Sequence, residues 1–225
     1  MSAVNEKKVA ALEAVKYVKS GMTVGLGTGS TAFYMIEAIG EMVQNGMEIK
    51  AVATSIETEK LATKLGINVI TLTEAKRLDV TIDGADEVDG DFQLIKGGGG
   101  ALLREKIVAY NSDINIIIAD SSKSVSKLGR FKLPIETIPF ATQLINKELN
   151  EMGLSPVQRL KGDVDYKTDE NNDILDIDIW DTHIKLTDLE QQLKTIPGIV
   201  ETGLFLTTTN LVIIGKGEEV IVKKR

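Results

Sequence analysis

Three short segments of the chain combine glycines with hydroxyl, carboxylate or ammonium side chains in patterns that could bind or transform a small substrate. They are residues 25–31 (Gly-Leu-Gly-Thr-Gly-Ser-Thr), residues 83–89 (Asp-Gly-Ala-Asp-Glu-Val-Asp) and residues 96–106 (Lys-Gly-Gly-Gly-Gly-Ala-Leu-Leu-Arg-Glu-Lys). Glycine-rich turns let backbone N–H groups approach an anion, carboxylates can transfer protons, and an ammonium group can stabilise an oxyanion. Each segment is therefore a candidate part of a functional site.

Residues 25–31 form a turn between a predicted strand and a predicted helix, where the N–H groups of the helix N-terminus favour a bound anion. The hydroxyl donors of this turn are Thr28, Ser30 and Thr31. A dinucleotide-binding motif fits only in a looser form, read from Gly27 to Ala32. Thr54 and Ser55 stand where that motif expects an acidic residue. A tight turn with a Ser or Thr helix cap explains the same residues.

Residues 83–89 come directly after a predicted strand, and ligands of open parallel sheets bind beyond the carboxyl ends of the strands. A solvated acidic turn or a loop that binds a divalent cation is the alternative explanation. The calcium-loop spacing does not fit from Asp83, because Ala85 and Glu87 fall at the second and third ligand positions.

Residues 96–106 place four consecutive glycines directly before a predicted helix, and such a run loses much conformational entropy on ordering. A flexible linker is the structural alternative, but a linker is not expected to open onto an amphipathic helix between two strands. Glu105 lies about one turn into that helix, where the helix dipole alone also favours a surface carboxylate.

The elements that must position these segments alternate between apolar strands and amphipathic helices. Strands are predicted at 23–26, 49–53, 68–70, 79–82 and 114–119, and helices within 1–21 and at 31–43, 57–65 and 102–110. Strands this apolar in an alternating order predict an α/β fold with a parallel sheet that helices cover on both faces.

The pattern changes near Arg130, where prolines punctuate the chain, and a smaller α+β domain is expected over residues 130–204. Within it we expect a helix at 141–152 and a hairpin-like stretch at 164–180 with its turn at 169–173. Ile177 and Ile179 alternate with polar neighbours, as in a half-exposed strand. Strands at 211–214 and 220–222 should return to the larger domain.

Composition excludes several classes of protein. The 225 residues are 43% hydrophobic and 26% charged, which is a globular profile. The chain has no Cys, so disulfides, thiol nucleophiles and Cys-held metals are excluded, and the reducing cytoplasm is the expected compartment. His183, the single histidine, is expected to be structural. A net charge of -7 without a basic stripe disfavours nucleic acid, and no run approaches the ~18 apolar residues of a membrane span.

The three segments, in this order, resemble ribose-5-phosphate isomerases of the A type, and Gly203-Leu204-Phe205 resembles that family's C-terminal signature. The resemblance spans nearly the whole chain, although residues 160–185 match loosely. It implies a Rossmann-like domain of residues 1–129 and 205–225, a small α+β domain at 130–204, and a homodimer or homotetramer without cofactor or metal. The implied reaction interconverts ribose 5-phosphate and ribulose 5-phosphate through an enediolate, as part of the pentose phosphate pathway.

The resemblance also implies roles for individual residues. Glu105 would be the base, and Asp83, Asp86 and Lys96 would line the reacting end of a sugar phosphate. The implied substrate-binding residues are Thr28, Gly29, Ser30, Thr31, Gly84, Ala85, Gly97, Gly98, Gly99 and Lys123. The chemistry agrees, because one carboxylate can take a proton from one carbon and return it to the neighbouring carbon.

Two other functions compete with an isomerase. A sugar-phosphate sensor would need neither Glu105 nor Lys96 and would usually carry an added DNA-binding or partner domain, of which the sequence shows no sign. A dinucleotide-dependent oxidoreductase is disfavoured by the missing acid at residues 54–55, and a cofactor titration would distinguish it.

Overall fold

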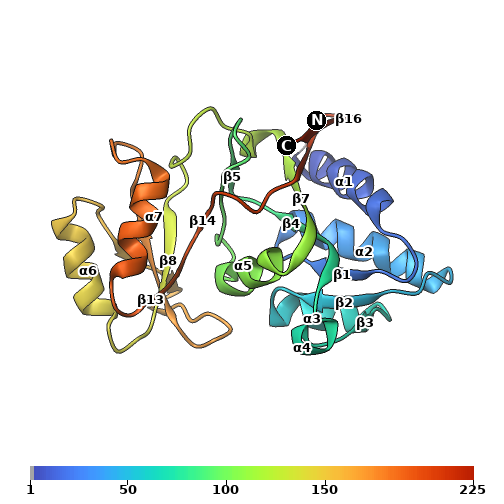
Figure 1. Ribbon diagram of the computed structural model, residues 1–225, viewed down its shortest axis with the longest axis horizontal. Helices are drawn as coiled ribbons and strands as arrows, with labels where there is room; N and C mark the ends of the chain where they lie inside the picture. Colours follow the sequence, from blue (N-terminus) through green and yellow to red (C-terminus); the bar gives the residue numbers. More distant parts are fainter. Residues whose placement is uncertain (1–2) are drawn as a thin grey trace.

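A seven-stranded, mostly parallel sheet is the centre of the computed structural model, which describes residues 3–225 (Figure 1). The strand order is β16-β15-β7-β4-β1-β2-β3, and only the pair β15–β16 is antiparallel. The bounds are β1 Thr23–Leu26, β2 Lys50–Ala53, β3 Asn68–Val69, β4 Leu78–Gly84, β7 Ser112–Asp120, β15 Leu211–Lys216 and β16 Glu219–Lys224. The predicted α/β fold class is confirmed.

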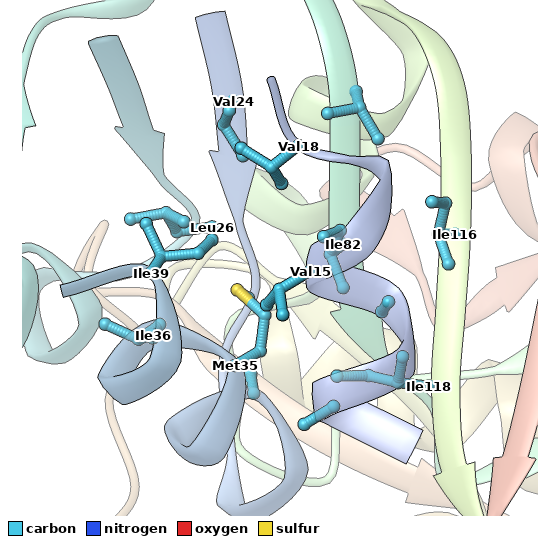
Figure 2. Packing of buried hydrophobic residues seen from close by; sticks show 14 of the residues in the cluster. Val15, Val18, Val24, Leu26, Met35, Ile36, Ile39, Ile82, Ile116 and Ile118 are labelled. Carbon is cyan, nitrogen blue, oxygen red and sulfur yellow. The ribbon is translucent and has the colours of Figure 1, made fainter. Parts of the chain in front are cut away.

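Both faces of this sheet are covered, as the apolar strands predict. In β7, Ile116 and Ile118 pack into the core under α1 and α2, while Ile117 and Ala119 pack into a cluster on the opposite face. Figure 2 shows the first of these cores, in which side chains of α2 meet those of β1, β4 and β7. The helices are α1 Ala3–Ala14, α2 Ser30–Gln44, α3 Ile56–Lys64, α4 Leu72–Ala75 and α5 Leu102–Tyr110, with 3-10 turns η1 Val15–Tyr17 and η2 Ser121–Lys123.

A small antiparallel sheet of two-residue strands lies on the α5 side of the central sheet. Its order is β14-β6-β5, formed by β14 Leu204–Phe205, β6 Leu94–Ile95 and β5 Glu87–Val88. Val88, Leu94 and Phe205 pack with residues of β7 and β15. Strands this short leave no alternating pattern in the sequence, which is why they were not predicted.

A four-stranded antiparallel sheet with its own core forms the other end of the molecule, at the left of Figure 1. Its order is β13-β8-β12-β9, with α6 and α7 packed against it. The bounds are β8 Leu133–Thr137, β9 Val157–Gln158, β12 Asp173–Ile177, β13 Ile199–Thr202, α6 Thr142–Glu151 and α7 Leu186–Thr195. A hairpin of β10 Leu160–Lys161 and β11 Val164–Asp165 adjoins it. The separate core supports the domain division at residues 130–204, which stays a prediction.

The predicted hairpin over 164–180 is wrong in its pairing. The predicted turn does form: Asn171 has φ 63°, and its N–H donates to the Thr168 carbonyl. The strands on either side of the turn do not pair with each other, because β12 pairs with β8 and β9 while β11 pairs with β10. Because both edges of β12 are occupied, β11 has no free edge of that strand to join. The alternation of Ile177 and Ile179 with exposed neighbours is confirmed, although β12 ends at Ile177.

The other predicted elements occur with shifts of one or two residues at their ends, except the opening helix, for which residues 1 and 2 lie outside the described residues. It was predicted within residues 1–21, but the α-helix ends at Ala14 and continues only as a 3-10 turn to Tyr17. Besides β5, β6 and β14, the elements that were not predicted are α4, α7, η2, β8, β9, β10 and β13. Within residues 3–225, no helix has the length and apolar character to cross a membrane.

Candidate active site

The three glycine-containing segments meet in one cavity beyond the carboxyl ends of β1 and β4. Its lining residues are Lys7, Thr28, Gly29, Ser30, Thr31, Gly84, Ala85, Asp86, Lys96, Gly97, Gly98, Gly99, Glu105 and Lys123. Every predicted site residue except Asp83 lies in this wall, and Asp83 lies directly behind it in contact with Lys96. This is the position where open parallel sheets bind ligands.

One end of the cavity is built around the buried ammonium of Lys96. Its Nζ lies 3.1 Å from Asp83 Oδ2 and 3.1 Å from Glu105 Oε1, and it donates to the carbonyl of Gly84. The three charged side chains are no more than 6% exposed. Glu105 stands in the first turn of α5, where its N–H donates to the Ala101 carbonyl at 3.0 Å, so the start of the helix fixes its place.

Asp83 is held by the backbone that surrounds it. Its Oδ1 accepts the N–H of Thr28 at 3.0 Å and that of Gly84 at 2.7 Å, which leaves Oδ2 for Lys96. A Cβ at Gly27 would overlap the Asp83 carboxylate, so the glycine there is required for the first and second segments to approach each other.

Burial gives Glu105 the properties of a base. Burial raises the pKa of Glu105 to about 8; the Lys96 ammonium opposes this rise and the Asp83 carboxylate adds to it. Burial disfavours the charged form of Lys96, but the carboxylates of Asp83 and Glu105 outweigh it and raise the pKa of Lys96. Glu105 Oε2 is buried and has no hydrogen-bond partner within residues 3–225. An unpartnered carboxylate oxygen with a raised pKa can accept a proton from a ligand in the cavity.

Asp86 ties the second segment to the glycine run. Its Oδ2 accepts the N–H of Gly98 at 2.7 Å, and a Cβ on Gly98 would crowd this carboxylate. Asp86 is half-buried and lines the cavity. It is therefore placed to exchange a proton with a hydroxyl group of a bound ligand.

The late motif Gly203-Leu204-Phe205 supports the same end of the site. Lys96 N–H donates to the Gly203 carbonyl at 2.9 Å, and the Phe205 ring lies 5.5 Å from Lys96 Nζ and 4.8 Å from Lys106 Nζ. The residue before β14 thus holds Lys96 from behind, and the Phe205 ring stabilises one buried and one half-buried ammonium group by cation–π contact.

The opposite end of the cavity is the N-terminus of α2. The N-cap is Gly29, with φ 101°, and no side chain caps the helix, so the alternative of a Ser or Thr cap is wrong. The N–H groups of the first turn have no intrahelical partners and carry a partial positive charge. The hydroxyl of Ser30 stands beside them, exposed.

Thr28 departs from its predicted role as a hydroxyl donor to an anion. Its Oγ1 lies 2.7 Å from Thr54 Oγ1 and 2.9 Å from Ser55 Oγ. Thr54 and Ser55, whose residue types disfavour a dinucleotide site, therefore support the turn from behind.

Two lysines, Lys7 and Lys123, complete this end, and only Lys123 was predicted from the sequence. Lys7 Nζ donates to Ser30 Oγ at 2.9 Å, and Lys123 lines the same cavity from η2. Glu6 joins their two elements, because its carboxylate accepts hydrogen bonds from Ser121 and from the N–H of Gly217. The sequence held no signal that singles out Lys7 among the lysines of the opening helix.

His183 is exposed in the loop before α7 and does not line the cavity. Within residues 3–225 no group of three or more His, Cys, Asp or Glu side chains could hold a metal ion.

The chain is similar to one family over most of its length. The family model for ribose 5-phosphate isomerase A (phosphoriboisomerase A) matches residues 50–219. The ribose-5-phosphate isomerase A of Listeria innocua is 48% identical over 225 residues, covering 98% of this chain and 100% of its own, and that of Sphingopyxis alaskensis is 46% identical over 222 residues, covering 99% and 97%.

Solved structures of the same family are also similar to this chain. Ribose 5-phosphate isomerase A of Methanocaldococcus jannaschii superimposes with a TM-score of 0.94 at 38% identity, and a D-ribose-5-phosphate isomerase in complex with phospho-erythronic acid superimposes with a TM-score of 0.95 at 37% identity. Both matches cover 100% of this chain and 100% of the other.

Proposed function

Since the chain belongs to the ribose 5-phosphate isomerase A family and interconverts ribose 5-phosphate and ribulose 5-phosphate, we propose that Glu105 is the base that moves the proton between C2 and C1. The observation that carries this proposal is the buried Glu105 Oε2, which has no partner within residues 3–225 although its carboxylate lines the cavity. Membership in this family decides in favour of an isomerase over a sensor or an oxidoreductase.

The proposed reaction begins with the open-chain aldehyde of ribose 5-phosphate. Glu105 takes the proton from C2, and the electron pair of that C–H bond forms the C1–C2 double bond while the aldehyde oxygen becomes negatively charged. The resulting enediolate is then protonated at C1 by the Glu105 carboxyl group, and the hydroxyl proton of O2 passes to O1, which gives ribulose 5-phosphate. One carboxylate thus serves both steps.

Lys96 is the group best placed to stabilise the negative oxygen. Its ammonium lies 3.1 Å from Glu105 Oε1 and is desolvated, so its charge acts strongly on an oxyanion that forms beside Glu105. Asp86 borders the cavity, and we assign to it the opening of the furanose ring and the movement of the hydroxyl proton. Asp83, whose two oxygens already have partners, holds the Lys96 ammonium in place from behind the cavity wall.

The phosphate group is proposed to bind at the N-terminus of α2. The free N–H groups of the first turn, the hydroxyls of Ser30 and Thr31, and the ammonium groups of Lys7 and Lys123 converge there. Phospho-erythronic acid, which one of the similar isomerases binds, resembles ribose 5-phosphate in having a phosphate at one end and an oxygen-rich group at the other. Binding the phosphate at α2 would orient C1 and C2 toward Glu105.

The proposal includes catalysis without a metal ion or cofactor. Both oxygens of Asp83 already have partners, the N–H groups of Thr28 and Gly84 and the Lys96 ammonium, so Asp83 offers a metal no free oxygen. We also propose a homodimer or homotetramer in the cytoplasm, from the family resemblance and the absence of Cys.

The test is a coupled assay of the purified protein with ribose 5-phosphate in the presence of EDTA. We expect ribulose 5-phosphate to form at the same rate with and without the chelator, and we expect inorganic phosphate to inhibit competitively. Loss of activity with EDTA and its return with Mg²⁺, Mn²⁺ or Zn²⁺ would move Asp86 from proton transfer to metal binding and would contradict the proposal of catalysis without a metal.

A further inference from the structure

The glycine run at residues 97–100 is held from outside by two residues that flank the β10–β11 hairpin, Arg159 before β10 and Tyr166 after β11. Arg159 Nη1 donates to the carbonyl of Gly97 at 2.7 Å and to that of Gly98 at 3.2 Å, and the Tyr166 hydroxyl donates to the carbonyl of Gly99 at 3.0 Å. Three consecutive carbonyls of a cavity wall are thus bound by two side chains that do not line the cavity.

Arg159 and Tyr166 are themselves fixed. The Arg159 guanidinium pairs with both oxygens of Asp176 in β12, with Nε–Oδ2 at 2.9 Å and Nη2–Oδ1 at 2.5 Å. The Arg159 N–H donates to the Ile174 carbonyl, and its carbonyl accepts the N–H of Tyr166. A bidentate pair and backbone bonds on both sides leave the guanidinium little freedom.

The direction of each carbonyl sets the direction of the next N–H. The described peptide bonds are trans and planar, so a C=O and the N–H of the same peptide unit point in opposite directions. Holding the Gly97 carbonyl outward aims the Gly98 N–H inward, where it donates to Asp86 Oδ2 at 2.7 Å. Holding the Gly98 carbonyl aims the Gly99 N–H away from Arg159, and no acceptor within residues 3–225 bonds to it.

Without these contacts the run would be the most adaptable backbone of the site. Four glycines have no side chains that restrict their dihedral angles, and Gly98 and Gly99 are exposed. Tyr166 also packs so closely on Gly100, which has φ 80°, that a Cβ there would overlap the phenol.

We infer that Arg159 and Tyr166 are positioning residues for the isomerisation, which fix the glycine run so that Asp86 and the Gly99 N–H face the reacting end. The inference rests on the proposed function of Glu105, Asp86 and Lys96. It gives the loosely matching segment 160–185 and its neighbours a role in the reaction, because they order the glycine run, which belongs to the part of the molecule built on the seven-stranded sheet.

The test compares Arg159→Met and Tyr166→Phe with a control, Glu170→Gln. The control removes the negative charge from another contact between the same two regions, the pair of Glu170 Oε1 with Arg104 Nε at 2.6 Å, and does not touch the glycine run. Four quantities are measured for each protein: kcat, KM, the inhibition constant of inorganic phosphate, and amide hydrogen exchange of residues 97–100.

We expect Arg159→Met to lower kcat about 10²-fold, as misplaced catalytic groups do, and to speed up exchange of the glycine run. Tyr166→Phe should lower kcat about two- to tenfold, the effect of one neutral hydrogen bond. Inhibition by phosphate should stay within about twofold of the wild type in every variant, because the N-terminus of α2 is untouched. Phosphate-binding stoichiometry counts the folded molecules, so kcat is expressed per folded molecule.

The inference is overturned if Arg159→Met keeps near-normal kcat per phosphate-binding molecule, or if Glu170→Gln loses as much activity. If Arg159→Met does not fold, Arg159→Lys replaces it; a lysine cannot bind Asp176 and two carbonyls together, so a smaller loss of kcat with faster exchange is expected. Wild-type protein without turnover would instead contradict the proposed function, and the exchange data would still test whether Arg159 holds the loop.

Discussion

The two ends of the cavity differ in the groups that form them and in how deeply those groups are buried. The reacting end consists of Lys96, Asp83 and Glu105, which are almost fully buried and pair with one another. The end at which we propose that the phosphate binds, called the phosphate end below, consists of helix N–H groups, the exposed Ser30 and the half-buried Lys7. Desolvation raises the pKa of a carboxylate into the range where it can take and return a proton, whereas binding an anion requires donors and no buried acid.

The two ends also differ in how they are held. Backbone groups of neighbouring segments fix Asp83 and Lys96 directly, through the N–H of Thr28 and the carbonyl of Gly84. Lys7 and Lys123, which we propose to bind the phosphate, instead stand on separate elements that one half-buried carboxylate, Glu6, joins. Substitutions at the reacting end should therefore change kcat, and those at the phosphate end should change KM.

The largest effect is expected for Glu105→Gln, which keeps the size of the side chain but removes the base. Loss of general-base catalysis predicts a fall in kcat of about 10²–10⁴-fold, and a larger fall if proton return uses the same group. Steady-state kinetics checks the rate, with the exposed helix residue Glu148→Gln as the matched control. Near-normal kcat in Glu105→Gln would make this residue structural and move the base to Asp83 or Asp86.

The pH dependence of kcat/KM in the wild type should follow the ionisation of the Glu105 carboxylate. A base works only when ionised, and a pKa of about 8 leaves Glu105 mostly protonated at pH 7, so kcat/KM should rise about tenfold per pH unit below pH 8 and level off above it. The measurement is kcat/KM from pH 5.5 to 9.5. A profile that is already flat above pH 5 would show that burial does not raise the pKa of the essential base.

At the phosphate end, Ser30→Ala and Thr31→Ala should chiefly raise KM. Losing a hydrogen bond to a charged group costs about 1.5–3 kcal/mol, which corresponds to roughly 10- to 150-fold in KM. Titration with inorganic phosphate checks the binding, and the exposed Ser126→Ala serves as the control. If both variants bind phosphate normally, the anion does not bind at the N-terminus of α2.

The smallest effect is expected for Glu6→Gln, which should raise KM a few-fold by loosening η2 and leave kcat unchanged. Hydrogen bonds from Gly217 and Ser121 lower the pKa of Glu6 to about 2, so the carboxylate stabilises the fold above its ordinary pKa of 4.5 and loses this effect as pH falls toward 2. The difference in Tm between wild type and variant should therefore shrink from pH 7 to pH 3. A constant difference would show that the carboxylate charge has no part in it.

The sequence predicts features that depend on neighbouring residues, and it does not predict those that depend on contacts between distant residues. The glycine-rich segments could be found because glycine, hydroxyl and acidic residues beside strand ends are local signals. Signals for two missed helices were also present: Thr71 and Glu74 form a capping box at α4, and Leu186, Leu189 and Leu193 have helical spacing in α7.

The remaining features depend on contacts between distant residues. Lys7 reaches Ser30 only because α1 packs beside α2, and Arg159 reaches the glycine run across 62 positions of the chain. The pairing of β12 with β8 and β9 is likewise decided by which strand edges the tertiary fold leaves free. A pattern of neighbours along the chain carries no information about such contacts.

The central claim, that Glu105 takes the proton from C2, is tested most directly by following the C2–deuterium bond itself. Ribose 5-phosphate labelled with deuterium at C2 is incubated with wild type and with Glu105→Gln, and NMR records the loss of the label from C2, whether the deuterium reaches C1 or water. The account predicts loss with the wild type and almost none with Glu105→Gln, although the variant still binds inorganic phosphate. Loss of the label at a comparable rate in the variant would contradict it.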